Sequence, residues 1–87
     1  MTEEATIHIS SAVVSVLPDH REEVLRALAT QADVEVYHAD ASKIVIVMEA
    51  AESGTLGSRL AEIACWPGVL SANMVFEQVE RLADIGG

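Results

Sequence analysis

Residues 43–50 read Lys-Ile-Val-Ile-Val-Met-Glu-Ala, an almost uninterrupted apolar run that is rich in β-branched side chains. Such a run is typical of a central strand whose two faces are both covered, by the protein itself or by a partner. The preceding residues 33–37, Asp-Val-Glu-Val-Tyr, alternate between polar and apolar side chains, as expected of a half-buried strand. A short turn over residues 39–42 separates the two runs, so we predict that they form a β-hairpin.

A strand followed by a helix is predicted before the hairpin. Residues 7–17, Ile-His-Ile-Ser-Ser-Ala-Val-Val-Ser-Val-Leu, are again rich in β-branched types, and Pro18 ends the run. Asp19 precedes Glu22 by three residues, which is the spacing at which two side chains can cap a helix N-terminus reciprocally. We therefore expect a helix over residues 19–31.

The same order of elements is repeated after the hairpin. Ser53 is a candidate helix cap, apolar residues follow it at three- and four-residue intervals, and Trp66-Pro67-Gly68 ends the helix. Residues 69–77 form the last predicted strand. The resulting order, β-α-β-β-α-β, indicates an α+β domain of the ferredoxin-like class. In this class two helices pack on one face of a four-stranded antiparallel sheet, and the other face stays open.

The length and composition fit one small globular domain. The chain has 87 residues, of which 51% are hydrophobic and 22% are charged. We assign residues 7–78 to the domain, residues 1–6 to a flexible N-terminal tail and residues 79–87 to a C-terminal tail. The formal net charge of −9 disfavours nucleic acid as a partner and favours a cationic one.

The sequence predicts a cytoplasmic location. Residues 1–4 are acidic where a secretory signal would be basic, and no apolar run approaches the ~20 residues needed to span a bilayer. The single cysteine, Cys65, allows no internal disulfide, which suits a reducing compartment. We therefore expect no membrane insertion.

The sequence contains no pattern that predicts catalysis, a metal site or a cofactor. His8, His20 and His38 fall on different predicted elements and lack the spacing of metal ligands. Cys65 is expected to be a small buried hydrophobe, because no base is positioned to activate it. We therefore predict that the protein is not an enzyme.

One enzyme class with this topology offers a comparison. Acylphosphatases bind phosphate in the loop between the first strand and the first helix, through backbone N–H groups and an arginine. The corresponding loop here, residues 17–21, contains Arg21 but no glycine. Pro18 removes an N–H donor and Asp19 adds a repelling charge, so the loop does not favour phosphate binding.

Strand parity divides the predicted sheet into two faces, because neighbouring side chains of a strand point to opposite sides. The helix-facing set is Ala12, Val14, Val16, Val34, Val36, Ile44, Ile46, Met48, Leu70, Ala72, Met74 and Phe76. The open-face set is Ile9, Ser11, Val13, Glu35, Tyr37, Lys43, Val45, Val47, Glu49, Ser71, Asn73, Val75 and Glu77. An apolar patch on an open face usually marks a partner site, although the β-propensity of valine or homodimerisation through the sheet would also place valines there.

Four stretches of the chain carry a family resemblance. They are residues 9–14 (Ile-Ser-Ser-Ala-Val-Val), 32–36 (Ala-Asp-Val-Glu-Val), 43–50 and 67–72 (Pro-Gly-Val-Leu-Ser-Ala). With these stretches, residues 7–78 resemble the NapD family of small cytoplasmic chaperones for the assembly of periplasmic nitrate reductase. The resemblance implies a protein that binds the twin-arginine signal peptide of the nitrate reductase catalytic subunit and delays export until the molybdenum cofactor is inserted. It also implies a monomer or weak self-association.

Such a signal peptide has a cationic front and an apolar segment, and the predicted open face complements both. The predicted peptide-binding residues are Ile9, Ser11, Val13, Glu35, Val45, Val47, Glu49, Asn73, Val75 and Glu77. The valines provide an apolar floor, the three glutamates pair with the arginines, and Ser11 and Asn73 hydrogen-bond the peptide.

Two other functions fit the same predicted fold. One is a small-molecule regulatory domain of the amino-acid-sensing type, which binds its ligand at a dimer interface. The other is a dimerisation module without a ligand. Both predict an obligate dimer at micromolar concentration.

Overall fold

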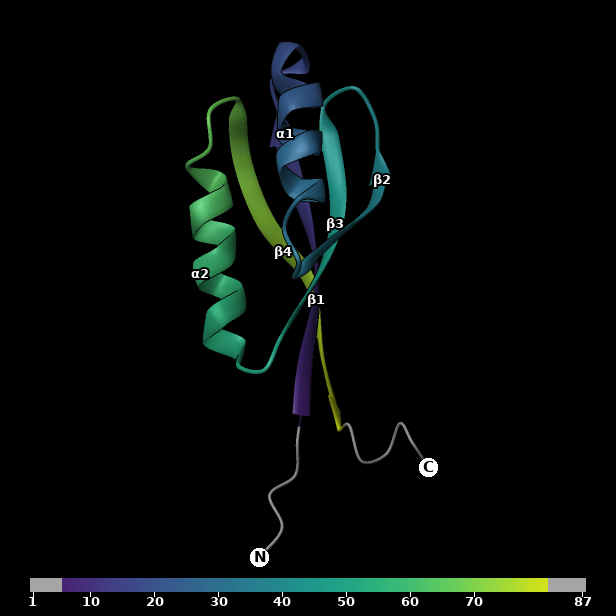
Figure 1. Ribbon diagram of the computed structural model, residues 1–87, viewed down its shortest axis with the longest axis vertical. Helices are drawn as coiled ribbons and strands as arrows, with labels where there is room; N and C mark the ends of the chain where they lie inside the picture. Colours follow the sequence, from purple (N-terminus) through teal and green to yellow (C-terminus); the bar gives the residue numbers. More distant parts are fainter. Residues whose placement is uncertain (1–5, 82–87) are drawn as a thin grey trace, which may run out of the picture.

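The computed structural model describes residues 6–81 and shows a four-stranded sheet with two helices (Figure 1). The elements are β1 (Thr6–Val16), a 3-10 turn (Pro18–His20), α1 (Arg21–Ala29), β2 (Val34–Ala39), β3 (Lys43–Ala50), α2 (Ser53–Ala64) and β4 (Val69–Arg81). The strands pair antiparallel in the order β2-β3-β1-β4. This arrangement confirms the predicted β-α-β-β-α-β order and the ferredoxin-like class. Among the described helices, none is long and apolar enough to cross a membrane.

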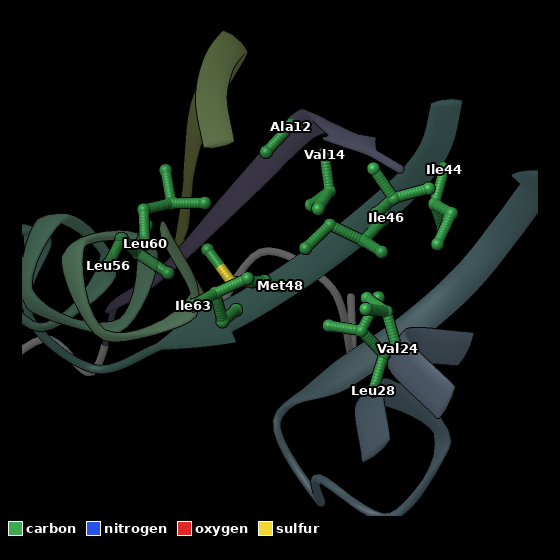
Figure 2. Close-up of a cluster of buried hydrophobic side chains, with 11 residues drawn as sticks. Ala12, Val14, Val24, Leu28, Ile44, Ile46, Met48, Leu56, Leu60 and Ile63 are labelled. Carbon is green, nitrogen blue, oxygen red and sulfur yellow. The ribbon is translucent and has the colours of Figure 1, made fainter. Parts of the chain in front are cut away.

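The core lies between one face of the sheet and the two helices. From Ser10 to Val16 in β1 and from Ile44 to Met48 in β3 every second residue is buried, and the buried apolar side chains point toward α1 and α2 (Figure 2). The buried core consists of Ala12, Val14, Val16, Val24, Leu28, Ile44, Ile46, Met48, Leu56, Leu60 and Ile63. For β1 and β3 the buried face is the one that strand parity predicted.

The start of α1 differs from the prediction. The helix begins at Arg21, and Pro18–His20 form a 3-10 turn closed by the His20 N–H, which donates to the Leu17 carbonyl oxygen at 2.9 Å. The residue that precedes the helix is His20, and its side chain makes no capping bond. The reciprocal cap predicted for Asp19 and Glu22 is therefore wrong, because the proline starts a tighter turn there.

The last strand is longer than predicted. β4 continues to Arg81, beyond the expected end at Glu77, because Thr6–Ile9 of β1 pair with Gln78–Arg81. This two-stranded extension projects past the ends of both helices (Figure 1). The remainder of the two tails assigned from the sequence, residues 1–5 and 82–87, lies outside the described residues.

Three bulges interrupt the strand pairing. In each bulge one residue lacks a Cα partner on the neighbouring strand: Leu70 and Val75 in β4 and Tyr37 in β2. An extra residue shifts the alternation of side chains by one position on one side of the bulge. The two edge strands therefore depart from simple parity, whereas β1 and β3 follow it.

Candidate functional site

The open face is the side of the sheet away from both helices, and the pairing registers show which residues lie side by side on it. Directly paired residues point to the same side, so the odd-numbered residues of β1 and β3 define the face and their partners share it. From one end of the strands to the other, the rows are Ile7 and Glu80; Glu49, Ile9 and Gln78; Glu35, Val47, Ser11 and Phe76; His38, Val45, Val13 and Asn73; and Lys43, Ser15 and Ser71.

The centre of the open face is apolar. Ile9, Val13, Val45 and Val47 are half-buried although both helices pack on the opposite side, and we call these four residues the aliphatic patch. Val45 is the direct partner of Val13. At the β4 edge, Phe76 lies opposite Ser11 and is 57% exposed. An uncovered surface of this kind is typical of a site for a partner.

Two carboxylates flank the aliphatic patch at its β2–β3 side. A shallow hollow of about 290 Å³ is lined by Ala32, Asp33, Val34, Glu35, Val47 and Glu49, and we call it the acidic hollow. Glu35 is paired with Val47, and Glu49 follows Val47 by two residues on β3. Both glutamates are exposed. Exposed carboxylates on either side of an aliphatic side chain suit guanidinium groups, whose methylene stems can pack on the valine.

Of the described residues, the other charged ones of the open face lie outside the acidic hollow. Glu80 occupies the β1–β4 extension, where its carboxylate accepts a hydrogen bond from the side-chain amide of Gln78. Lys43 occupies the opposite end of β3. Charge on this face is therefore unevenly distributed, with two exposed carboxylates, Glu35 and Glu49, at one corner and Lys43 at the other end of β3.

Eight of the ten predicted peptide-binding residues lie on the open face. They are Ile9, Ser11, Val13, Glu35, Val45, Val47, Glu49 and Asn73. The structure brings the two glutamates of this set together with Val47 in the acidic hollow, which strand parity alone did not predict.

The other two predicted residues are displaced by the bulge in β4. Glu77 is paired with the fully buried Ser10 and lies 3.5 Å from His8 Nδ1, so its placement on the open face was wrong. Val75 is the extra residue of the bulge. The direct neighbour of Ser11 is instead Phe76, which parity had assigned to the helix side.

Two further parity assignments, those of Tyr37 and Leu70, change for the same reason. Tyr37 is a bulge residue and is 77% exposed, and His38 takes the open-face position opposite Val45. Leu70, predicted to face the helices, is 64% exposed, and Val69 packs against the core in its place.

An ion pair on the helix side supports the wall of the acidic hollow. Arg59 of α2 donates from Nε to Asp33 Oδ2 at 2.8 Å and from Nη2 to Asp33 Oδ1 at 3.2 Å. The Glu49 N–H donates to the Asp33 carbonyl oxygen at 3.2 Å. Asp33 therefore connects α2 to the strand that carries Glu49. The side-chain hydrogen bond from Arg59 holds the pKa of the Asp33 carboxyl below its usual range. The same hydrogen bond raises the pKa of Arg59.

We expect the Asp33→Asn substitution to change the stability of the protein mainly above pH 4. A carboxyl whose pKa is lowered by folding stabilises the native state above its unfolded pKa of about 3.9, and this stabilisation is lost as the pH falls through the folded pKa. Because the pair is partly exposed, the substitution should cost about 1 kcal/mol or less at neutral pH. Urea unfolding between about pH 7 and pH 3 should show the difference from wild type shrinking as the pH falls.

Asp40 provides the control for this pH series. Its carboxylate accepts hydrogen bonds from the backbone N–H groups of Ser42 and Lys43, which also lower its pKa, but it lies in the exposed β2–β3 turn. The Asp40→Asn variant should lose the pH-dependent stabilisation that comes from the turn. It should keep the part that comes from the pair of Asp33 and Arg59. A difference between Asp33→Asn and wild type that grows as the pH falls would contradict the assignment to the Arg59 pair.

The histidines and the cysteine do not form a reactive centre. His8, His20 and His38 lie on β1, the 3-10 turn and β2. Within residues 6–81, no group of three or more His, Cys, Asp or Glu side chains could hold a metal ion. Cys65 is exposed, which corrects the prediction that it is buried. It follows the core residue Ile63 by two positions, which turns it about 200° away from the core at 3.6 residues per turn.

The family model described as "NapD protein" matches residues 7–81. "Chaperone NapD" of Paracoccus pantotrophus is 41% identical over 73 residues, which cover 84% of this chain and 65% of that relative. This chain therefore spans slightly less than two thirds of the relative's length.

Two solved structures share the fold. The solution structure of the E. coli Tat proofreading chaperone protein NapD matches with a TM-score of 0.74 and 26% identity, over 83% of this chain and 78% of that one. A transcriptional regulatory protein of the AsnC family from Pyrococcus furiosus matches with a TM-score of 0.60 and 18% identity, over 86% of this chain and 50% of that one. At this identity the second likeness shows the fold alone.

The fold defines a small ferredoxin-like domain with one uncovered, partly apolar sheet face. The extent of the family match makes the assignment specific: the chain belongs to the NapD family. Its two named relatives in this family are chaperones, which is a non-enzymatic role. This agrees with the prediction that the protein is not an enzyme.

Proposed function

We propose that this chain is a cytoplasmic chaperone that binds the twin-arginine signal peptide of the catalytic subunit of a periplasmic nitrate reductase. Binding delays export of the subunit until the molybdenum cofactor is inserted. The observation that carries the proposal is the position of the acidic hollow directly beside the aliphatic patch on one uncovered face. Membership of the NapD family supports the proposal, as does the similarity to the E. coli Tat proofreading chaperone NapD.

The apolar part of the peptide supplies most of the affinity. Each Å² of apolar surface removed from water over the aliphatic patch contributes roughly 25 cal/mol. The peptide is disordered before it binds, so part of this gain is offset by the ordering of its chain. Ser11 lies between Val47 and Phe76, and Asn73 lies beside Val13. Both side chains provide hydrogen-bonding groups for polar atoms of the peptide.

The acidic hollow supplies orientation and selectivity. Carboxylates at a site steer a cationic ligand during association, and a bidentate pair with a guanidinium adds geometric specificity. Glu35 and Glu49 are placed for this role, and the net charge of −9 over the whole chain acts in the same direction.

The proposal predicts discrimination between arginine and lysine. A synthetic peptide with two adjacent arginines before an apolar segment should bind roughly tenfold more tightly than the same peptide with two lysines, a difference of about 1.4 kcal/mol, because only the guanidinium forms bidentate pairs with carboxylates. Isothermal titration calorimetry at low and raised salt measures both affinities. The advantage of arginine should shrink as salt screens the exposed carboxylates. Absence of binding, or equal and salt-insensitive binding of both peptides, would reject the proposal.

The oligomeric state separates this function from the two alternatives. Sedimentation velocity at micromolar concentration should show a monomer or a weakly associating species that binds the peptide. An obligate dimer that does not bind the peptide would instead indicate a regulatory or dimerisation domain.

A further inference from the structure

We infer that the signal peptide binds with one fixed polarity, with its two arginines in the acidic hollow and its apolar segment directed across the strands toward Phe76 on β4. This inference rests on the proposed function and goes beyond it, because it identifies the arginine subsite and the direction of the bound chain. Three features of the open face carry it.

The first feature is the distribution of carboxylates. Of the described residues, three carboxylates follow the open-face register: Glu35, Glu49 and Glu80. Glu35 and Glu49 line one hollow, whereas Glu80 is alone on the β1–β4 extension and already accepts a hydrogen bond from Gln78. Two adjacent arginines need two acceptors close together, and the acidic hollow provides them.

The second feature makes the opposite end of the face less favourable for the arginines, although the Asp40 carboxylate lies in the adjacent turn. Lys43 lies two residues beyond Val45 on β3, and His38 lies beside Val45 on β2. In the row that holds Lys43, the neighbouring open-face residues are Ser15 and Ser71, which are neutral. A cationic peptide end placed there would face a like charge, which is unfavourable.

The third feature is the apolar path that leads away from the hollow. From Val47, the row passes Ser11 to Phe76, while Val45 and Val13 lie in the adjacent row. Crossing from β2 to β4 spans three strand spacings of about 4.8 Å, or roughly 14 Å. This distance equals about ten residues of helix at 1.5 Å per residue. Phe76 is the exposed aromatic side chain at the end of that path.

Paramagnetic labelling of the peptide tests the polarity. The probe is the twin-arginine peptide with one cysteine, placed either at the arginine end or at the apolar end and spin-labelled through a disulfide. The protein is the full chain labelled with nitrogen-15, carrying Cys65→Ser so that the exposed thiol cannot exchange with the label. Loss of amide signal intensity then reports which residues lie near each end of the peptide.

The label at the arginine end should reduce the amide signals of Glu35, Val47 and Glu49 most strongly. The label at the apolar end should reduce those of Asn73 and Phe76. The reversed pattern would overturn the inference while leaving the proposed function intact, as would an arginine-end label that acts on Gln78 and Glu80. Absence of any peptide-induced spectral change would overturn the proposed function, and this inference with it.

A side-chain variant gives an independent readout of the same geometry. The Phe76→Ala substitution should weaken binding of the arginine and lysine peptides by the same factor, because Phe76 contacts the apolar segment only. A selective loss of affinity for the arginine peptide would place the arginines at β4 and contradict the inferred polarity.

Discussion

Replacing both Glu35 and Glu49 by glutamine is expected to weaken binding of the twin-arginine peptide about a hundredfold, with roughly tenfold lost for each carboxylate. The substitution keeps the size of each side chain and removes the charge that pairs with a guanidinium. A hydrogen bond to a charged group contributes about 1.5–3 kcal/mol, and we take the lower value because both glutamates are exposed. Calorimetric titration of both single variants and of the double variant measures the effect.

The loss should be about tenfold greater for the arginine peptide than for the lysine peptide, which removes the difference between their affinities. Because the aliphatic patch remains intact, the double variant should bind the arginine peptide and the lysine peptide with similar affinities. Glu22→Gln is the matched control, since it removes one exposed carboxylate from α1, on the helix side of the molecule. Glu77→Gln tests the corrected placement of Glu77. Neither variant should change the affinity by more than about twofold, which is the range of a weak surface charge effect.

A different outcome would identify a different arginine site. If Glu77→Gln weakened binding as much as Glu35→Gln, the peptide would have to reach the helix side of β4. If the double variant bound with unchanged affinity, the acidic hollow would not be the arginine subsite. Thermal unfolding of each variant shows whether a loss of affinity reflects a loss of folded protein.

The sequence was sufficient to predict the central part of this site. β1 and β3 lie in the interior of the sheet and alternate regularly, so the burial of Ile44 and Ile46 on one face placed Val45 and Val47 on the other. The hydrophobic pattern of these two strands specifies their register, because a slip of one residue would expose the whole core face. The topology followed from the order of the predicted elements.

The edge strands could not be predicted in the same way. Each bulge adds one residue whose position depends on the pairing with the neighbouring strand, and nothing in Met74-Val75-Phe76 indicates where that residue falls. Parity therefore placed Phe76 on the helix side and Glu77 on the open face, the reverse of the observed arrangement. The acidic hollow was also beyond sequence reasoning, because it combines residues 32–35 with Val47 and Glu49 from the neighbouring strand.

Substituting Gly68 by alanine is expected to destabilise the protein by about 3 kcal/mol, a sum of backbone strain and steric overlap. Gly68 has a φ of +86°, a conformation that residues with a Cβ rarely adopt. A Cβ at this position would also lie 2.3 Å from the Cβ of His20. The Gly68 carbonyl oxygen accepts a hydrogen bond from the Leu17 N–H at 2.8 Å, so the loop cannot move away without losing this contact. For a domain of this size, we expect the melting temperature to fall by about 15 °C.

Two further variants separate the steric effect from the backbone effect. His20→Gly removes the atoms that the new methyl group would meet. In the double variant of His20→Gly and Gly68→Ala, only the backbone strain at residue 68 should therefore remain. Compared with His20→Gly alone, the double variant should be less stable by about 1–2 kcal/mol. Gly57→Ala is the matched control, because a Cβ there meets no atom within 4 Å and the residue lies inside α2. This change should stabilise the protein by about 0.5–1 kcal/mol, since alanine favours the helix over glycine. If Gly68→Ala were as well tolerated as Gly57→Ala, the chain at residue 68 could not have the left-handed conformation that brings it against His20.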